Sequence, residues 1–149
     1  MLAKLVQSGG LSAIARQLGI THAKALEEAR IILPGLIAGV AGFPGGLGAF
    51  LDLTGKHGGE QLAVQVMGQN QVSTLAGETI IAQFGMRDLP IEGLSVEDAA
   101  IRLKMAPLLT MLIAGYLWAR SAAGNLTHAE VSRLLALDDL ADRSGQEPV

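Results

Sequence analysis

The chain has 149 residues, a length that suits one domain with a core large enough to need no disulfide or metal. It contains no cysteine, which excludes thiol catalysis, disulfides and cysteine-ligated metals. The net charge is −3, so there is no basic surplus of the kind that nucleic-acid binding needs. Aromatic residues make up 3% of the chain, which predicts an aliphatic core between closely packed helices.

Two short helices are expected first, over residues 2–7 and 11–18. The second has its apolar residues at helical spacing, and Gly19 follows as a C-cap. Thr21 is a suitable N-cap for a third helix. The polar face of that third helix is predicted to carry His22, Lys24, Glu27, Glu28 and Arg30.

Residues 31–51 contain no charged side chain. Pro34 is expected to kink or end the third helix, and residues 43–48 are predicted to form a turn. A run of this length would cross a bilayer, and Gly35 and Gly39 have the spacing that lets membrane helices approach closely. We prefer a buried helix with close packing, and a hairpin dipping into one membrane leaflet stays as the alternative.

Four further helices are predicted. They cover residues 60–67, residues 72–84, a long helix from Val96 to Ala119 kinked at Pro107, and a last helix to about Ala141. Ser95 with Asp98, and Thr127 with Glu130, form capping boxes before the last two. No stretch alternates between apolar and polar residues for long enough to predict a strand. The expected fold class is therefore all-α, a compact bundle of about seven helices.

The sequence contains two degenerate repeats, at about residues 10–50 and 70–120, with Pro34 and Pro107 in matching places. Residues 1–120 are therefore expected to form one domain. Residues 121–149 are expected to add an acidic helix and a frayed tail, and they supply the whole net charge.

No catalytic, cofactor-binding or metal-binding residue is predicted. The three histidines, His22, His57 and His128, have no metal-ligand spacing. Glu78 lies in an otherwise apolar helix and is expected to be a buried polar group that caps the helix or pairs with a lysine or arginine in the core. Asp52 and Glu60 are isolated, and no base has a visible partner, so we do not expect an enzyme.

Residues 14–26 have the layout of a helix-turn-helix, but the second helix carries Glu27 and Glu28, so DNA binding is disfavoured. No secretory signal or lipidation motif is evident, and a cytoplasmic location is expected.

Several glycine- and proline-containing segments resemble the YidB-like family, a bacterial domain of unknown function. The matching segments are residues 58–68, 80–85, 93–99 and 106–109. The resemblance implies a compact helical protein without an assigned reaction, and it supplies no catalytic residue. The chain departs from the family pattern by inserting residues 87–92 and by adding the acidic helix after Asn125.

The expected function is a non-enzymatic interaction or assembly module, because apolar residues exceed what so few polar ones can shield. Its partner is expected to be a second copy or another protein. The alternatives are membrane association through residues 31–51 and binding of a small apolar ligand. The candidate interface residues are Tyr116, Trp118, Gly35, Gly39 and Phe43. Burial of Tyr116 and Trp118 in the core is an equally weighted alternative.

Overall fold

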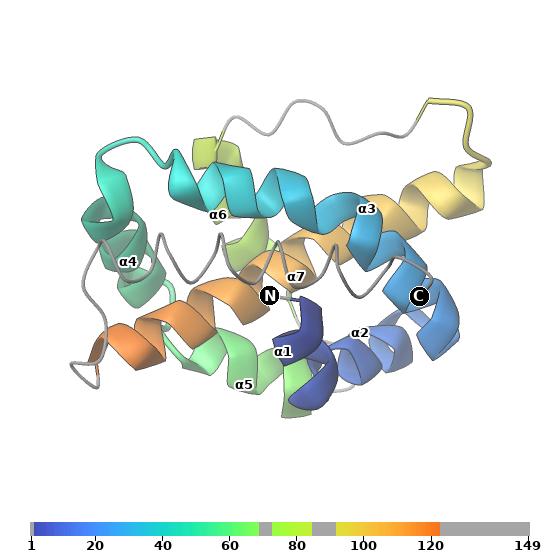
Figure 1. Cartoon of the computed structure of the whole chain (residues 1–149), viewed down its shortest axis with the longest axis horizontal. Coiled ribbons are helices and arrows are strands. Elements are labelled where there is room, and N and C mark those ends of the chain that lie inside the picture. Colours follow the sequence, from blue (N-terminus) through green and yellow to red (C-terminus); the bar gives the residue numbers. More distant parts are fainter. Residues whose placement is uncertain (1, 69–72, 85–91, 123–149) are drawn as a thin grey trace, which may run out of the picture.

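The computed structural model describes residues 2–68, 73–84 and 92–122. Within these residues all regular structure is helical, in seven helices, which confirms the predicted all-α bundle (Figure 1). The predicted helix to Ala141 lies outside the described residues. The helices are α1 (Leu2–Gln7), α2 (Gly10–Leu18), α3 (His22–Ala41), α4 (Gly46–Lys56), α5 (Gln61–Gly68), α6 (Leu75–Phe84) and α7 (Val96–Ala122).

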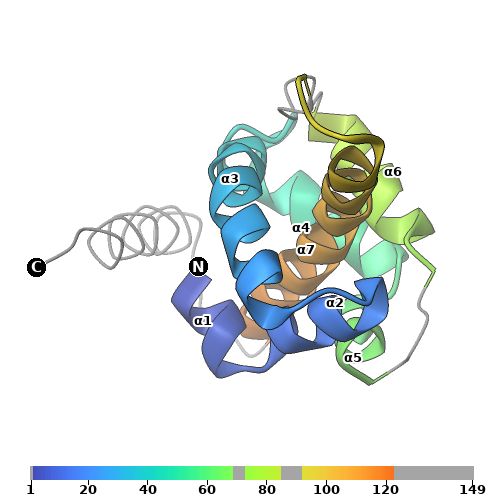
Figure 2. The same cartoon turned by 90° about the vertical axis from the view of Figure 1, so that its right-hand side faces the viewer.

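Helix α7 is the core of the bundle. Helices α2 to α6 all pack against it, and the view along its axis shows them arranged around it (Figure 2). Every residue from Met105 to Gly115 is buried, which covers about three full turns. A helix that is apolar on all sides is stable in water only when other elements enclose it, and α7 meets this condition.

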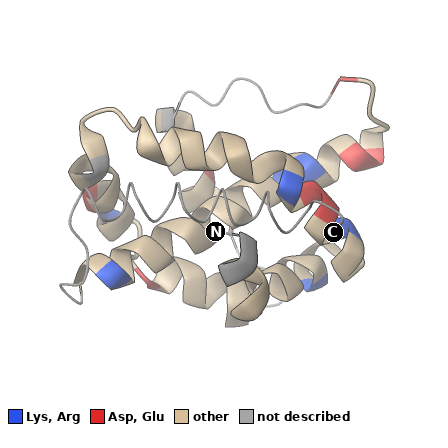
Figure 3. Cartoon of the chain, viewed as in Figure 1, with Lys and Arg blue, Asp and Glu red and all other residues tan. Residues whose placement is uncertain are grey.

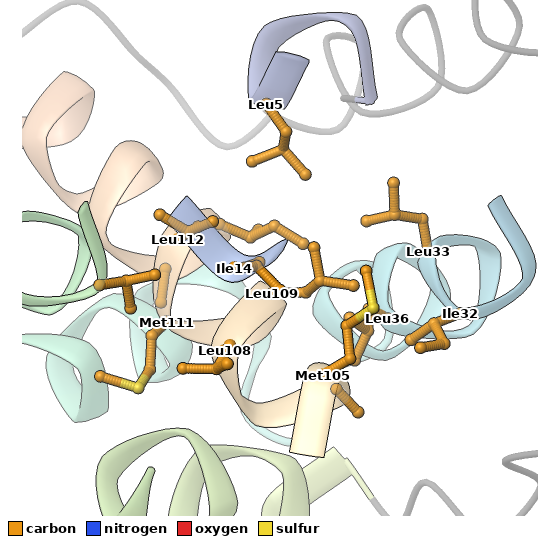
Figure 4. Packing of buried hydrophobic residues seen from close by; sticks show 14 of the residues in the cluster. Leu5, Ile14, Ile32, Leu33, Leu36, Met105, Leu108, Leu109, Met111 and Leu112 are labelled. Atoms are coloured by element: carbon orange, nitrogen blue, oxygen red, sulfur yellow. The ribbon is translucent and has the colours of Figure 1, made fainter. Parts of the chain in front are cut away.

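Aliphatic side chains from both halves of the chain fill the space around α7. Ile14 of α2 and Leu36 of α3 are fully buried, and they lie beside Met105 and Leu109 of α7 (Figure 4). Leu5 of α1 approaches the same cluster from the outer side. The expected aliphatic core is therefore present.

Glycine allows several of these helices to approach α7 closely. A Cβ added to Gly77 of α6 would overlap the backbone carbonyl of Pro107. One added to Gly115 of α7 would lie 2.8 Å from the Cβ of Ala63 in α5. Real Cβ atoms do not come so close to other heavy atoms, so the α6–α7 and α5–α7 contacts depend on glycine at these two positions.

Both long helices continue through their prolines. Pro34 lies on the exposed side of α3, whereas Pro107 is buried in α7. Proline cannot donate a hydrogen bond to the carbonyl four residues earlier, which in α7 belongs to Leu103. The Leu103 residue is 53% exposed. Pro34 and Pro107, which occupy matching places in the two predicted repeats, thus differ in burial. The repeat itself stays a prediction.

Helix α4 was not predicted. The expected turn over residues 43–48 is shorter, since α3 ends at Ala41 and α4 already begins at Gly46, after Gly45 with a φ of 88°. Three glycines in α4 lower its intrinsic helix propensity. Burial of Phe50 and Thr54 against the rest of the bundle stabilises it instead, and this tertiary contribution is not visible in the local pattern.

The predicted caps at Thr21, Ser95 and Gly19 are confirmed, whereas the capping box predicted at Thr127 and Glu130 lies outside the described residues. Thr21 Oγ1 accepts a hydrogen bond from the Lys24 N–H at 3.1 Å, and Ser95 Oγ accepts one from the Asp98 N–H at 3.1 Å. Gly19 ends α2 with a left-handed φ of 66°. At the end of α5, the Arg16 side chain donates to the Met67 carbonyl at 3.0 Å, which satisfies one of the last carbonyls of that helix.

We predict that Gly77→Ala lowers the free energy of unfolding by about 1–3 kcal/mol, because the new methyl group forces α6 away from the Pro107 backbone. Chemical denaturation followed by circular dichroism measures this change. Gly68→Ala is the matched control, since its added Cβ meets nothing within 4 Å and its φ is not positive. Equal stability of the two variants would contradict the close contact.

Candidate functional site

A buried ion pair joins α3 to α7. Arg102 Nε donates to Glu28 Oε2 at 2.6 Å, and Arg102 Nη2 donates to Oε1 at 3.3 Å. Glu28 is 2% exposed and Arg102 is 5% exposed. Lys24 Nζ lies 3.3 Å from Glu28 and 3.4 Å from Asp98, so charges of both helices gather at one end of the bundle (Figure 3).

The prediction that Glu28 lies on a polar face was wrong. Glu28 follows Ala25 by three residues and precedes Ile32 by four, and both of these are fully or almost fully buried. Those spacings place all three on one face of a helix. Arg102 likewise precedes the buried Met105 by three residues. The sequence did contain a signal for this pair. An acidic residue, Glu28, is spaced with the apolar residues of α3, and a basic residue, Arg102, is spaced with those of α7.

The ion pair is suited to holding helices together and not to proton transfer. Burial raises the pKa of the Glu28 carboxyl, but hydrogen bonds from Arg102 and Lys24 outweigh burial and leave the pKa below its ordinary value. The carboxylate therefore stays ionised at neutral pH. Glu28 and Arg102 line neither of the two hollows between α2 and α7 and between α1, α5 and α7.

Glu78 is exposed, contrary to the expectation of a buried polar group. The preceding residue, Gly77, faces α7, and successive residues in a helix are rotated by about 100°, which turns Glu78 outward. Asp52 and Glu60 are exposed as well. Among the described residues, no three His, Asp or Glu side chains are grouped so that they could hold a metal ion.

The aromatic candidates for an interface lie in different places. Phe43 is 7% exposed and packs edge-on against Phe50 with ring centroids 5.4 Å apart, so it is a core residue and was wrongly assigned to a surface. The short chain between α3 and α4 turns it inward. Trp118 is half-buried, and a Cβ added to Gly59 would lie 3.0 Å from its ring. Its ring therefore packs against the segment between α4 and α5.

The glycine candidates lie on α3, with Gly35 exposed and Gly39 half-buried. Their neighbours Ile32, Leu36 and Val40 point into the core. In the second half of α3 the exposed residues Pro34, Gly35 and Ala38 offer little apolar area, whereas Ile31 is 41% exposed. Of the five predicted interface residues, Tyr116 lines the groove between α1, α5 and α7.

A groove of about 470 Å³ lies between α1, α5 and α7. One wall is a stripe of α5 and the other is a stripe of α7, and both have the spacing i, i+3, i+4, i+7. Each stripe is one face of a helix about 10 Å long. The lining residues are Leu5, Gln7 and Ser8 of α1, Glu60, Ala63, Val64 and Met67 at α5, and Leu112, Gly115, Tyr116 and Ala119 of α7.

Apolar side chains at the groove are open to solvent. Val64 is 53% exposed and Met67 is 37% exposed. The Tyr116 hydroxyl accepts a hydrogen bond from Arg120 Nη1 at 3.1 Å, and the guanidinium lies over the tyrosine ring. The groove lining is mostly apolar, with Gln7, Ser8, Glu60 and the Tyr116 hydroxyl as its polar groups. An exposed apolar concavity of this kind is the usual form of a binding site.

A second hollow, of about 320 Å³, lies between α2 and α7 next to Thr74. Its lining mixes Gln17, Thr74 and Lys104 with apolar side chains. It is therefore less suited to an apolar partner than the α1/α5/α7 groove.

One helix of the described part, α7, is long and apolar enough to cross a membrane. However, 72% of its most apolar window is buried inside the bundle, as expected for a core helix. Residues 31–51, the segment of the membrane hypothesis, form the second half of α3, a turn and the first half of α4. Most of their large apolar side chains that the structure describes are buried, among them Ile32, Leu33, Leu36, Phe43 and Phe50, whereas Ile31 is 41% exposed.

Comparison with family models, with curated proteins and with solved structures found no match to this chain. The resemblance to the YidB-like family is accordingly neither supported nor contradicted.

We predict that Glu28→Gln lowers the free energy of unfolding by about 3 kcal/mol at neutral pH, because it leaves the buried Arg102 without a counter-charge. The depressed pKa of Glu28 means that its contribution is present at neutral pH. This contribution is lost as pH falls below the ordinary glutamate pKa and through the lower folded value. Urea denaturation from pH 7 to pH 3 should therefore show a shallower acid loss in Glu28→Gln.

Glu27→Gln is the matched control, because Glu27 is exposed and adjacent in sequence. It should keep both the stability and the acid profile of the original chain. An equal loss in both variants would mean that the ion pair does not hold α3 to α7.

Proposed function

We propose that this protein is a non-enzymatic interaction module, and that its α1/α5/α7 groove binds an amphipathic helix of a protein partner. The observation that carries the proposal is the shape of the groove, which two helical stripes of equal length enclose. A third helix with apolar residues at i, i+3, i+4 and i+7 fits between such stripes in the helix-in-groove mode of recognition.

The sizes of the lining side chains favour a helix as the guest. Ala63, Gly115 and Ala119 are small and leave space at the bottom of the groove. Val64 and Met67 are larger, and they border it on the α5 side. Methionine adapts its shape to different apolar partners, which suits a rim residue of a binding groove.

The charge distribution supports a protein partner over a nucleic acid. The groove is lined by one acidic residue, Glu60, and by no lysine or arginine. A phosphate backbone needs several cations on the contacting face. Among the described residues, the buried ionisable cluster around Glu28 is already internally paired, which favours binding over catalysis.

We predict that a short synthetic amphipathic helix with leucines at i, i+3, i+4 and i+7 binds the full chain in this groove. Titration at high peptide concentration, followed by amide chemical shifts in NMR, should move the signals of Val64, Gly115 and Tyr116. Val64→Asp should weaken binding by about tenfold or more, since it places a charge against the apolar guest.

The chain offers a matched control at Leu103. Leu103 and Val64 are both 53% exposed, but Leu103 lies outside the groove. Leu103→Asp should leave peptide binding unchanged. Equal weakening by both substitutions, or shifts confined to the other hollow, would contradict the proposed site. Binding of detergent monomers but of no peptide would favour a small apolar ligand instead.

A further inference from the structure

We infer that the α1/α5/α7 groove selects its partner helix by charge. An acidic side chain on one flank of the guest's apolar stripe pairs with Arg120, and a basic side chain on the other flank pairs with Glu60. The inference rests on the proposed function, because it names the class of helix that the groove accepts. It concerns the end of the groove at which α7 finishes and α5 begins.

Glu60 lies on the α5 side of this end. It lines the groove directly before α5, and it is exposed. A Cβ added to Gly59 would lie 3.0 Å from the Trp118 ring. Ala63 lies against Gly115, which precedes Trp118 by three residues. Helix α5 is therefore antiparallel to α7, and Glu60 lies near the last turns of α7.

Arg120 lies on the opposite flank of the groove. It follows Trp118, which faces the start of α5, by two residues, and this is a rotation of about 200° around the helix axis. Arg120 Nη1 donates to the Tyr116 hydroxyl at 3.1 Å, and the guanidinium carbon lies 5.8 Å from the centre of the Tyr116 ring. Because Tyr116 lines the groove, these contacts keep the guanidinium at its edge.

The Arg120 guanidinium has hydrogen-bonding capacity left over. Its Nε is buried and has no hydrogen-bond partner in the described structure. A buried donor without an acceptor costs free energy, and an acceptor supplied by a partner removes that cost. The guanidinium charge is spread over three nitrogens, so a carboxylate that approaches any edge of the group is stabilised.

The described part of the chain neutralises neither of these two charges. Ion pairs between described residues form around Glu28, at the other end of α7, and they involve Lys24, Asp98 and Arg102. Arg120 contacts the uncharged Tyr116 instead. Both rim charges are therefore available to a guest.

The two charges impose an order on the guest. A helix that lies along α7 places its apolar stripe in the groove and its two flanking positions toward opposite rims. At this end, one flank faces Glu60 and the other faces Arg120. The matched order brings opposite charges together, whereas the exchanged order brings like charges together and is rejected. The apolar groove thus provides capture, and the rim charges provide selection.

Synthetic helices that differ only in charge order test this inference on the full chain. Each has the same leucine stripe, flanked at a terminal turn by one glutamate and one lysine in either order, and a third helix has glutamine at both positions. One series places these residues in the first turn and another in the last turn, which covers both directions of the guest. In one series, one order should bind roughly fivefold or more tightly than the other, with the neutral helix between them. The difference should decrease at high salt.

Substitutions in the chain identify the groups that read the order. Glu60→Arg combined with Arg120→Glu should reverse the preferred order, a result that loss of structure cannot produce. Glu60→Gln, at an exposed position, should reduce the preference by itself. Lys104→Gln is the matched control, because Lys104 is exposed on α7 and lies outside the groove. It should leave the preference unchanged.

The outcomes separate this inference from the proposed function. Equal affinity for both orders in both series, with the neutral helix still bound, overturns the inference and leaves the helix-binding function intact. A preference that Glu60→Gln leaves at full size, or that the exchanged chain fails to reverse, also overturns the inference. Binding of none of the helices contradicts the function and the inference together.

Discussion

The close approach of neighbouring helices to α7 is the constraint on which the rest of the structure depends. At the α6 contact, Gly77 lies against the backbone of Pro107, and at the α5 contact Gly115 lies against Ala63. Because these contacts bring backbones together, helices with few aromatic residues still enclose α7 from Met105 to Gly115. Enclosure allows a helix with almost no polar face to exist inside a bundle.

The same packing produces the groove. Ala63 and Gly115, through which α5 approaches α7, are small and line the groove between α1, α5 and α7. Ala119 continues this small-residue wall to the last turn of α7. The feature that stabilises the core thus creates the apolar concavity proposed as the binding site, and no separate polar machinery is needed for helix capture.

The sequence correctly predicted those features that depend only on residues close in the chain, namely the helix caps. Thr21, Ser95 and Gly19 were assigned correctly, because a cap depends on the nearest backbone groups. Glu28 and Glu78 were misplaced, since their burial depends on which face of each helix meets α7. The groove was found only in part, through Tyr116, because α1, α5 and α7 are far apart in sequence. The spacing of apolar residues within one helix does not reveal which face of another helix lies opposite.

Native-state hydrogen exchange of the full chain, resolved by NMR, tests the central position of α7 most directly. Amides that open only with the whole fold exchange most slowly. The enclosure of α7 predicts that the slowest amides are those of Leu108 to Ala114, with α1 and the outer face of α3 exchanging earlier. Exchange of Leu108 to Ala114 before α3 would contradict the account, because α7 would then be peripheral and the groove along it would not be a fixed surface.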